Sequence, residues 1–287
     1  MGFGSGFGVN FTASTRFSGG DGGGTDRLSG PYASYDTALA ALRADAAASD
    51  GDVYQLTDER IYVAYVSEGP GVLLPPPLAR RVLGYVDTSA GDAYFTLSDD
   101  EDTDGDLTAR GLILSEAATA TSSKVAGSPL ELRAPASGDF CSLTATPSAS
   151  QTKTLALMRV SALRAETDAA SSVIDLFVGS GARRARVSLS LGGEGVVDFA
   201  SASNAIESDQ QGVSPVLSDG WLLVALDGTD NAQQASASLI DNDAVRTVEY
   251  ADLTSSVDDT LYLQVQAFTP NLDTQLDVDE LHWLRMS

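Results

Sequence analysis

The sequence predicts a mainly β chain: an antiparallel β-sandwich preceded by a small α+β module and a glycine-rich arm. Three observations support this prediction. The first 30 residues contain ten glycines, too many for a stable helix or strand of their own. One capped amphipathic helix follows, over residues 34–48. From Arg81 onward the chain shows short runs of alternating apolar and polar residues separated by turn signals, which is the pattern of a sandwich.

The glycine-rich arm comprises residues 1–31. It carries four phenylalanines, Phe3, Phe7, Phe11 and Phe17. Because an exposed flexible tail rarely carries so many aromatic side chains, we expect them to attach the arm to a neighbouring subunit, with the glycines allowing close approach of the backbones. The alternative is a flexible leader whose aromatic residues are incidental.

The predicted module spans residues 32–104. Ser34 or Asp36 caps its helix, and two strands follow at Val53–Leu56 and Ile61–Val66, joined by a short hairpin loop. A capped Ala/Leu helix followed by DGDVYQLTDERIYVAYVSEGPGVLLPPPLA resembles a small helix-plus-hairpin module found in virion appendage proteins of tailed bacteriophages. The resemblance implies that this part of the chain attaches the protein to a particle.

The predicted sandwich spans residues 105–287. Its longest alternating runs include Thr154–Leu163 and Thr260–Phe268, and the second of these places four apolar residues on one face, as an inner layer requires. The segments ARGLILSEAATATSSKVAGSPLEL, LSDGWLLVALDG and DVDELHWLRM resemble the concanavalin A-like (laminin G-like) jelly-roll sandwiches of phage tail and fibre proteins. The resemblance implies an antiparallel jelly-roll sandwich.

Charge and composition exclude several classes of function. With 17 basic and 40 acidic side chains the formal charge is −23, which disfavours nucleic acids and anionic membrane surfaces as partners. An acidic surface adapted to a saline habitat is an alternative origin of this charge. One cysteine and one histidine, Cys141 and His282, exclude an intrachain disulfide and a cysteine-based zinc site, and argue against a Ser–His–Asp triad. We expect neither a secretion signal nor a membrane span.

The acidic stretch DDEDTDGD is the best candidate for a metal site. Asp100, Asp102, Asp104 and the glycine after it match the first half of a calcium loop, and Asp106 could add a backbone carbonyl. The twelfth position is Gly111, so the bidentate glutamate of such a loop is absent. A structural Ca²⁺ site and a solvated acidic linker are both compatible with this pattern.

The sequence offers candidate residues for glycan binding but a poor basis for catalysis. Sandwiches bind sugars with exposed aromatic residues, and the candidates are Trp221, Tyr250 and Tyr262, although Trp221 lies in an apolar run and could pack in the core. Glycosidases need two carboxylates across the scissile bond. The residues that come nearest to such a pair are Asp277, Asp279 and Glu280, which are interpreted as charged residues on a solvated strand face, and His282 is interpreted as a packed structural residue.

Together these features predict a non-enzymatic virion protein of a tailed phage that requires no cofactor. The N-terminal part would dock to other virion proteins, and the sandwich would project, with a host-surface glycan as a possible ligand. Appendages of this kind are usually symmetric homo-oligomers, so we expect a homotrimer. The alternative is a lectin-like module that binds or degrades polysaccharide.

Overall fold

The computed structural model divides the chain into two compact units, Met1–Ser89 and Ala90–Ser287. The structure describes residues 27–66, 71–76, 78–79, 82, 91–98, 103–145, 153–165, 172–180, 183–190, 194–201, 204–212, 220–227, 233–241, 244–253, 261–267 and 274–286. The four phenylalanines of the predicted arm lie outside these residues. Within the described part of the chain, no helix is long and apolar enough to cross a membrane.

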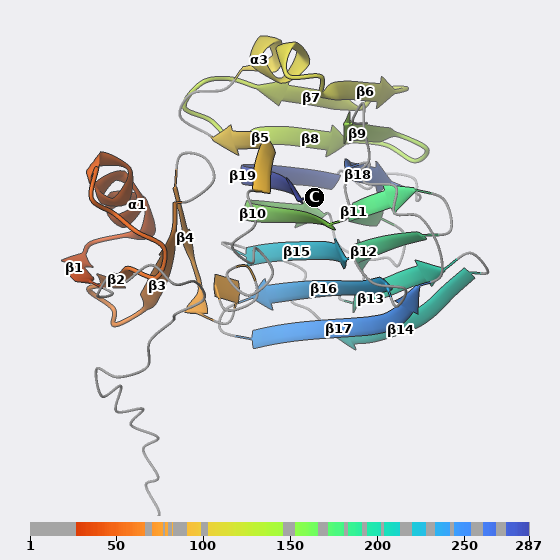
Figure 1. The fold of residues 1–287 in the computed structure, drawn as a ribbon. Helices are drawn as coiled ribbons and strands as arrows, with labels where there is room; N and C mark the ends of the chain where they lie inside the picture. The colour runs from red at the N-terminus through yellow and green to blue at the C-terminus, as the bar shows by residue number, and fades with distance from the viewer. Residues whose placement is uncertain are drawn as a thin grey trace, which may run out of the picture. The chain divides into compact units, whose positions relative to one another are not determined.

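The N-terminal unit contains a four-stranded sheet and the α-helix α1 (Figure 1). The sheet order is β1-β2-β3-β4; β1 and β2 are parallel, and the other two pairings are antiparallel. The elements are β1 (Leu28–Tyr32), α1 (Tyr35–Ala44), β2 (Val53–Leu56), β3 (Ile61–Tyr65) and β4 (Val72–Leu74). The helix and the hairpin β2–β3 occupy the segments that the sequence predicts, whereas β1 falls partly within the predicted arm. The likeness to a phage attachment module stays a prediction.

Helix α1 is positioned by its cap and by one apolar face. The Ser34 Oγ accepts a hydrogen bond from the Thr37 backbone N–H, and the Thr37 hydroxyl accepts one from the Ser34 N–H, which is a reciprocal capping arrangement. Tyr35 and Leu42 are buried on the inner face, and the Tyr35 hydroxyl donates to the Leu73 carbonyl at 3.0 Å. The helix ends at Ala44, four residues before the predicted end, because the next residue has an extended backbone conformation.

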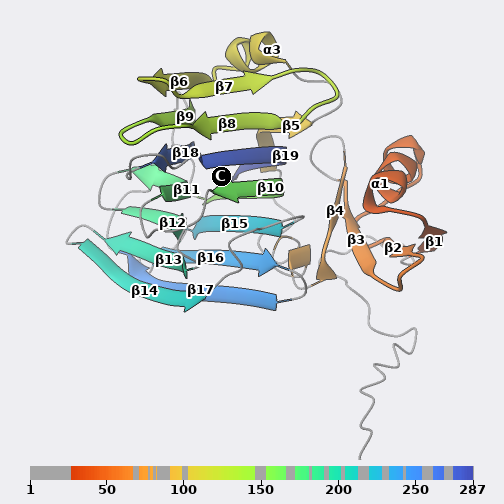
Figure 2. The same cartoon turned by 180° about the vertical axis from the view of Figure 1, so that it is seen from behind.

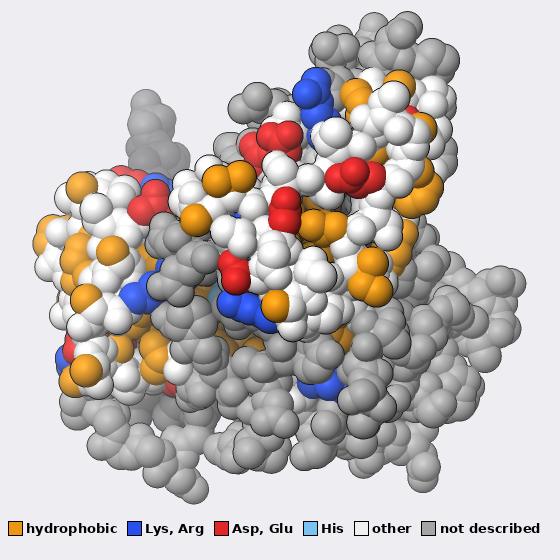
Figure 3. Space-filling model, turned by 90° about the horizontal axis from the view of Figure 1, so that it is seen from above, with side chains coloured by type: hydrophobic (Ala, Val, Ile, Leu, Met, Phe, Trp, Pro, Cys, Tyr) orange, Lys and Arg blue, Asp and Glu red, His pale blue; other side chains and the backbone are white. Residues whose placement is uncertain are grey.

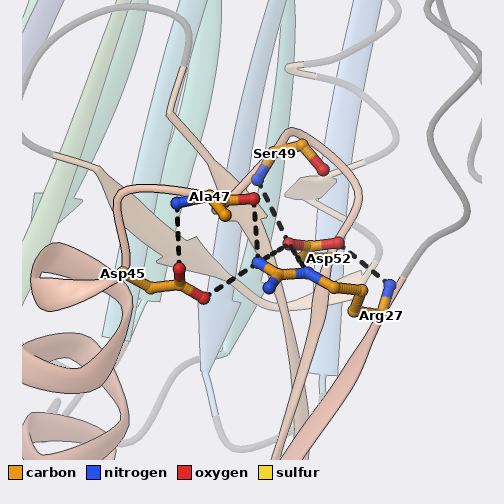
Figure 4. A network of polar contacts seen from close by, with 5 residues as sticks. All are labelled: Arg27, Asp45, Ala47, Ser49 and Asp52. Carbon is orange, nitrogen blue, oxygen red and sulfur yellow. Dashed lines mark hydrogen bonds and ion pairs between the residues drawn. The ribbon is translucent and has the colours of Figure 1, made fainter.

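A polar network closes the N-terminal unit at the C-terminal end of α1 (Figure 4). The Arg27 guanidinium donates to Asp52 Oδ2 from Nε at 3.1 Å and from Nη2 at 2.7 Å, and Nη2 also donates to Asp45 Oδ2 at 2.9 Å and to the Ala47 carbonyl at 3.0 Å. The Asp52 carboxylate also accepts from the backbone N–H groups of Arg27 and Ser49. The network therefore ties the start of β1 to the loop between α1 and β2.

The C-terminal unit is a sandwich of two antiparallel sheets that face each other (Figures 1 and 2). The first sheet has the order β17-β16-β15-β10-β19-β8-β7, with β5 paired to β19, and the second has the order β14-β13-β12-β11-β18-β9-β6. The first contains β5 (Gly91–Ser98), β7 (Thr121–Lys124), β8 (Leu130–Ala134), β10 (Lys153–Ala165), β15 (Gly220–Asp227), β16 (Gln233–Asp241), β17 (Ala244–Leu253) and β19 (Thr274–Met286). The second contains β6 (Ile113–Ala117), β9 (Phe140–Ala145), β11 (Ser172–Ser180), β12 (Arg183–Ser190), β13 (Glu194–Ser201), β14 (Asn204–Gly212) and β18 (Leu261–Ala267). The short helix α3 (Asp104–Ala109) precedes β6.

One hydrophobic core fills the space between the two sheets. Strand β18 contributes every second residue to it, from Leu261 to Ala267, as its alternation predicts. Strands β10 and β19 pair along most of their length in the middle of the first sheet, and Met158 and Trp283 lie in the same core. The buried Trp283 Nε1–H donates to the Thr154 hydroxyl at 2.9 Å, so the polar atom of its ring is satisfied.

The structure corrects the predicted domain boundary from residue 104 to residue 89. Strand β5 pairs antiparallel with β19, with Leu97 opposite Leu281, and both of these side chains are buried in the sandwich core. Residues 91–98 therefore belong to the sandwich and not to the N-terminal module. The sequence could not show this, because the partner of β5 lies about 180 residues further along the chain.

Candidate functional site

The outward-facing side chains of β18 and β9 form a half-buried polar surface on the second sheet. Core residues alternate with them along both strands, which assigns the remaining positions to the outer face. We name this set the β18–β9 strip; its members are Tyr262, Gln264 and Gln266 of β18 and Phe140, Ser142 and Thr144 of β9. All are half-buried except Ser142, which is buried.

The pairing of the two strands arranges the strip in three rows. Tyr262 lies opposite Thr144, Gln264 opposite Ser142, and Gln266 opposite Phe140. The two aromatic residues therefore occupy opposite ends of the strip on neighbouring strands, and the central row carries an amide and a hydroxyl. The strip combines apolar ring surface with polar groups that can both donate and accept hydrogen bonds.

Hydrogen bonds orient the side chains of β18. The Tyr262 hydroxyl donates to Gln264 Oε1, and Gln264 Nε2 donates to Gln266 Oε1 at 2.8 Å. An amide side chain has two N–H donors and an oxygen that can accept two hydrogen bonds. The ladder uses one of the donors and one of the acceptor positions of Gln264. The ladder therefore holds the amides in one orientation and leaves them capacity for a ligand.

None of the six strip residues is charged, although the chain carries −23. Strand β11 continues the sheet beyond β18, where Asp175 pairs in register with Gln264. On the described surface seen in Figure 3, acidic and basic side chains are interspersed with hydrophobic and neutral ones. The strip is thus an uncharged surface in an acidic protein, with one acidic register position next to it.

The three residues predicted to bind a glycan lie in different environments. Tyr262 lies in the strip. The prediction of an exposed aromatic platform is wrong for Trp221, which is 2% exposed, because both faces of β15 are buried at this point of the sheet. Tyr250 pairs in register with Ala235 on β17 and β16, and its side chain lies outside the described residues.

The two described residues of the predicted calcium loop serve the local structure. Asp104 and Asp106 belong to α3, where Asp106 Oδ2 accepts hydrogen bonds from the Thr103 hydroxyl and backbone N–H, and these hydrogen bonds lower the pKa of Asp106. Asp104 Oδ1 accepts from the Lys124 backbone N–H at 2.6 Å. Asp100 and Asp102 lie outside the described residues, and no group of three His, Cys, Asp or Glu residues able to hold a metal occurs among the described ones. The Ca²⁺ site stays a prediction.

A second cluster of ionisable residues lies on β10 and β19 of the first sheet. Arg159 Nη1 is 3.8 Å from Glu280 Oε1 and 3.9 Å from Asp279 Oδ2, and His282 Nε2 is 3.1 Å from Glu280 Oε2. The prediction that these acids line a solvated strand face is wrong, because Glu280 is 1% and Asp279 6% exposed. A β-bulge at Asp279 shifts the register of β19 against β10. His282 is buried as expected.

The strip contains residues that the sequence alone did not single out. Gln264, Gln266 and Phe140 belong to it in addition to Tyr262. A signal was present in LYLQVQA, where the residues that alternate with the apolar ones are one tyrosine and two glutamines. The contribution of Phe140 depends on the pairing of strands more than 100 residues apart, and no local pattern indicates it.

Comparison with known proteins gives similarity in structure only. No protein-family model matches the chain, and no curated protein matches it in sequence. The chain is similar to the legume lectin-like domain from Entamoeba histolytica, with 6% identity and a TM-score of 0.48 over 68% of this chain and 98% of that one. It is similar to the carbohydrate recognition domain of Emp46p in its metal-free form, with 11% identity and a TM-score of 0.45 over 68% and 97% of the two chains.

A third similar structure is a carbohydrate esterase from the Shiga toxin-encoding bacteriophage phi24B, with 13% identity and a TM-score of 0.44 over 69% of this chain and all of that one. All three similarities have TM-scores below 0.5. The predicted fold class is confirmed: the chain is mainly β, and its C-terminal unit is an antiparallel sandwich.

Proposed function

We propose that the protein is a non-enzymatic glycan-binding component of a tailed-phage virion, and that the β18–β9 strip binds a host-surface glycan. The observation that carries the binding proposal is the hydrogen-bonded ladder of Tyr262, Gln264 and Gln266 on the outer face of the second sheet. The virion proposal rests on the sequence resemblances of residues 32–80 and 107–287.

The chemistry of the strip suits a sugar. A pyranose ring has an apolar face that packs on an aromatic ring, and hydroxyls around its edge that both donate and accept hydrogen bonds. Tyr262 and Phe140 supply aromatic surface, while the amides of Gln264 and Gln266 supply donors and acceptors. Because the ladder orients the amides before the ligand arrives, less conformational entropy is lost on binding.

The proposal that the protein is not an enzyme is supported by the state of its buried carboxylates. A general acid or nucleophile must reach the substrate. Glu280 is 1% exposed and contacts both Arg159 and His282, so its carboxylate is engaged in the packing of β10 against β19. The strip itself carries no ionisable side chain other than the Tyr262 phenol.

Binding is tested with the full chain on a glycan array and then by calorimetry with the glycans that bind. Tyr262→Ala and Gln264→Ala are each expected to lower affinity about 10-fold, the effect of losing roughly 1–1.5 kcal/mol of contacts. Gln275→Ala is the matched control: Gln275 is a half-buried amide on the other sheet, hydrogen-bonded to Asp277 and Glu131, and its loss should leave affinity unchanged.

Three outcomes would overturn parts of this proposal. An array without signal, both with calcium and with a chelator, would remove glycan binding. An equal loss of affinity in Gln275→Ala would remove the strip as its site. Release of new reducing ends from the bound polysaccharide would show that the protein is an enzyme.

The virion role is tested through self-association. The part of the proposed arm that precedes residue 27 should hold a homotrimer together, so light scattering of the full chain is expected to give a trimer mass. A chain that begins at residue 27 keeps the Arg27 network of the N-terminal unit but lacks the four phenylalanines, and should be monomeric. A full chain that stays strictly monomeric at high concentration would argue against the assembly.

A further inference from the structure

We infer that the ligand of the strip is an uncharged oligosaccharide of several residues that lies along β18, with one sugar against Tyr262 and another against Phe140. This inference rests on the proposed function and adds to it the length and the charge of the glycan. It depends on three features of the strip: the separation of its two aromatic rings, the direction of its hydrogen bonds and its lack of charge.

The separation of the aromatic residues follows from strand register. Tyr262 is in the row of Thr144, and Phe140 is in the row of Gln266, so the two aromatic residues are four positions apart along the strand direction. At about 3.4 Å per residue this separation is roughly 14 Å. A single pyranose ring is much shorter, so one sugar cannot pack on both rings. A chain of several sugars can reach from one ring to the other.

The polar groups between the rings suit hydroxyls rather than anions. Gln264 Oε1 accepts from the Tyr262 hydroxyl and its Nε2 donates to Gln266, so acceptor and donor groups alternate along β18. A sugar hydroxyl can donate to one group and accept from the next. A carboxylate or phosphate only accepts, so it could use the amide N–H donors but would leave the remaining acceptor positions of the amide oxygens without a donor.

The charge of the protein also favours a neutral ligand over an anionic one. None of the six strip residues is cationic, and the neighbouring strand β11 places Asp175 in register with Gln264. The first cation in the row of Tyr262 is Arg186 of β12, one strand beyond Phe177 of β11. With a formal charge of −23, the chain also repels anionic polymers at long range, an effect that salt screens. An anionic oligosaccharide of equal length should therefore bind more weakly than a neutral one, and the difference should shrink as salt is added.

The test measures affinity against chain length. Fragments of one to six residues are prepared from a neutral glycan that binds on the array and titrated into the full chain by calorimetry. We expect affinity to rise at least 10-fold between the disaccharide and the tetrasaccharide and then to level off. Phe140→Leu should lower affinity for the tetrasaccharide roughly 5- to 10-fold and leave affinity for the monosaccharide unchanged.

Controls separate a local effect from misfolding. Ile113 is 62% exposed on β6 and pairs in register with Thr144, beside the path between the two rings, so Ile113→Ala should bind every fragment normally. If Phe140→Leu loses its folded circular dichroism spectrum, Gln266→Ala in the same row replaces it, with the same expectation. Equal affinity for the monosaccharide and the tetrasaccharide, or tighter binding of uronic acid oligomers than of neutral ones, would overturn the inference while leaving glycan binding intact. An array without signal would instead overturn the proposed function itself.

Discussion

The substitution Asp52→Asn should destabilise the N-terminal unit much more than the removal of an equally short ion pair at its surface. The Asp52 side chain is 1% exposed and accepts four hydrogen bonds, three on Oδ2 and one on Oδ1. Asparagine keeps the shape but has one acceptor oxygen. In its best orientation that oxygen faces the three donors, and the new NH₂ group faces the backbone N–H of Arg27.

The magnitude follows from what is lost. The two bonds from the Arg27 guanidinium lose their charge assistance, about 1 kcal/mol in total after allowance for the exposure of Arg27, and one half-buried backbone N–H loses its acceptor, at about 2 kcal/mol. The sum is about 3 kcal/mol. Since 1.36 kcal/mol corresponds to a factor of ten, amides protected by unfolding of this unit should exchange roughly 150-fold faster.

Hydrogen exchange read by mass spectrometry resolves the two units within the full chain. Peptides that cover β2 and β3 should show the acceleration, and peptides that cover β18 should not change. The control is Asp58→Asn, which removes the Arg60–Asp58 pair at 2.8 Å, where both side chains are about half exposed (48% and 51%). Exposed pairs of this kind contribute little, so exchange should stay near wild type. Similar acceleration in both variants would refute the argument from burial.

The same carboxylate makes the N-terminal unit sensitive to acid. Burial raises the pKa of Asp52, but hydrogen bonds from the Arg27 side chain, the Arg27 backbone and Ser49 outweigh it, so the pKa lies below its ordinary value. A lowered folded-state pKa contributes stability that is present above about pH 4 and is lost as the pH falls through the folded-state pKa. Exchange of the β2–β3 peptides, corrected for intrinsic rates, should therefore accelerate below pH 4 in the wild type and less so in Asp52→Asn.

Three further predictions concern the sandwich. Thr154→Val removes the acceptor of the buried Trp283 N–H and should cost about 1–3 kcal/mol in urea unfolding, whereas adding Trp283→Phe to Thr154→Val should cost less than the sum of the two single substitutions. Burial raises the pKa of Cys141 to about 12, so a thiol reagent at pH 8 should leave it unmodified in the folded chain and label it fully in urea. Hydrogen bonds from Thr119 lower the pKa of Asp139, so Thr119→Val should reduce the loss of stability between pH 5 and pH 3.

Much of the fold could be predicted because strand alternation is a local signal. The run Leu261–Ala267 places its apolar residues in the core as its sequence indicates, and the capped helix begins where Ser34 predicts. The errors arise where the local pattern and the long-range pairing differ. The sequence assigned residues 91–98 to the wrong unit because their only described partner strand is β19.

Around Glu280, one extra residue in β19 makes the strand faces differ from those that strict alternation predicts. Strict alternation places Asp277 and Asp279 on one face and Glu280 on the other. The β-bulge at Asp279 breaks that rule, so Glu280 pairs with Arg159 while Val278 pairs with Val160. Both Asp279 and Glu280 are consequently buried beside the Arg159 guanidinium. A bulge of this kind depends on the partner strand, so the sequence of β19 alone does not reveal it.

The candidate site was predicted only in part for a related reason. Tyr262 stands out as an aromatic residue on a polar strand face, but an aromatic residue becomes a binding surface only through its neighbours on adjacent strands. Those neighbours come from β9, more than 100 residues earlier in the chain. Trp221 illustrates the converse: its sequence made it a candidate, yet its side chain is 2% exposed, although its neighbour Leu222 and not Trp221 belongs to the core between the sheets.

The two sheets differ in what their outer faces can do. On β10 and β15 several of the residues that alternate with the core are apolar and at most 1% exposed, namely Leu155, Leu157 and Leu223, so this part of the face is covered. On β18 the corresponding residues are polar and half-buried. The outer face of the second sheet therefore offers a ligand both aromatic ring surface and hydrogen-bonding groups. The central strands of the first sheet do not. The contrast explains why the smaller Tyr262, and not Trp221, is the aromatic residue on which glycan binding should depend.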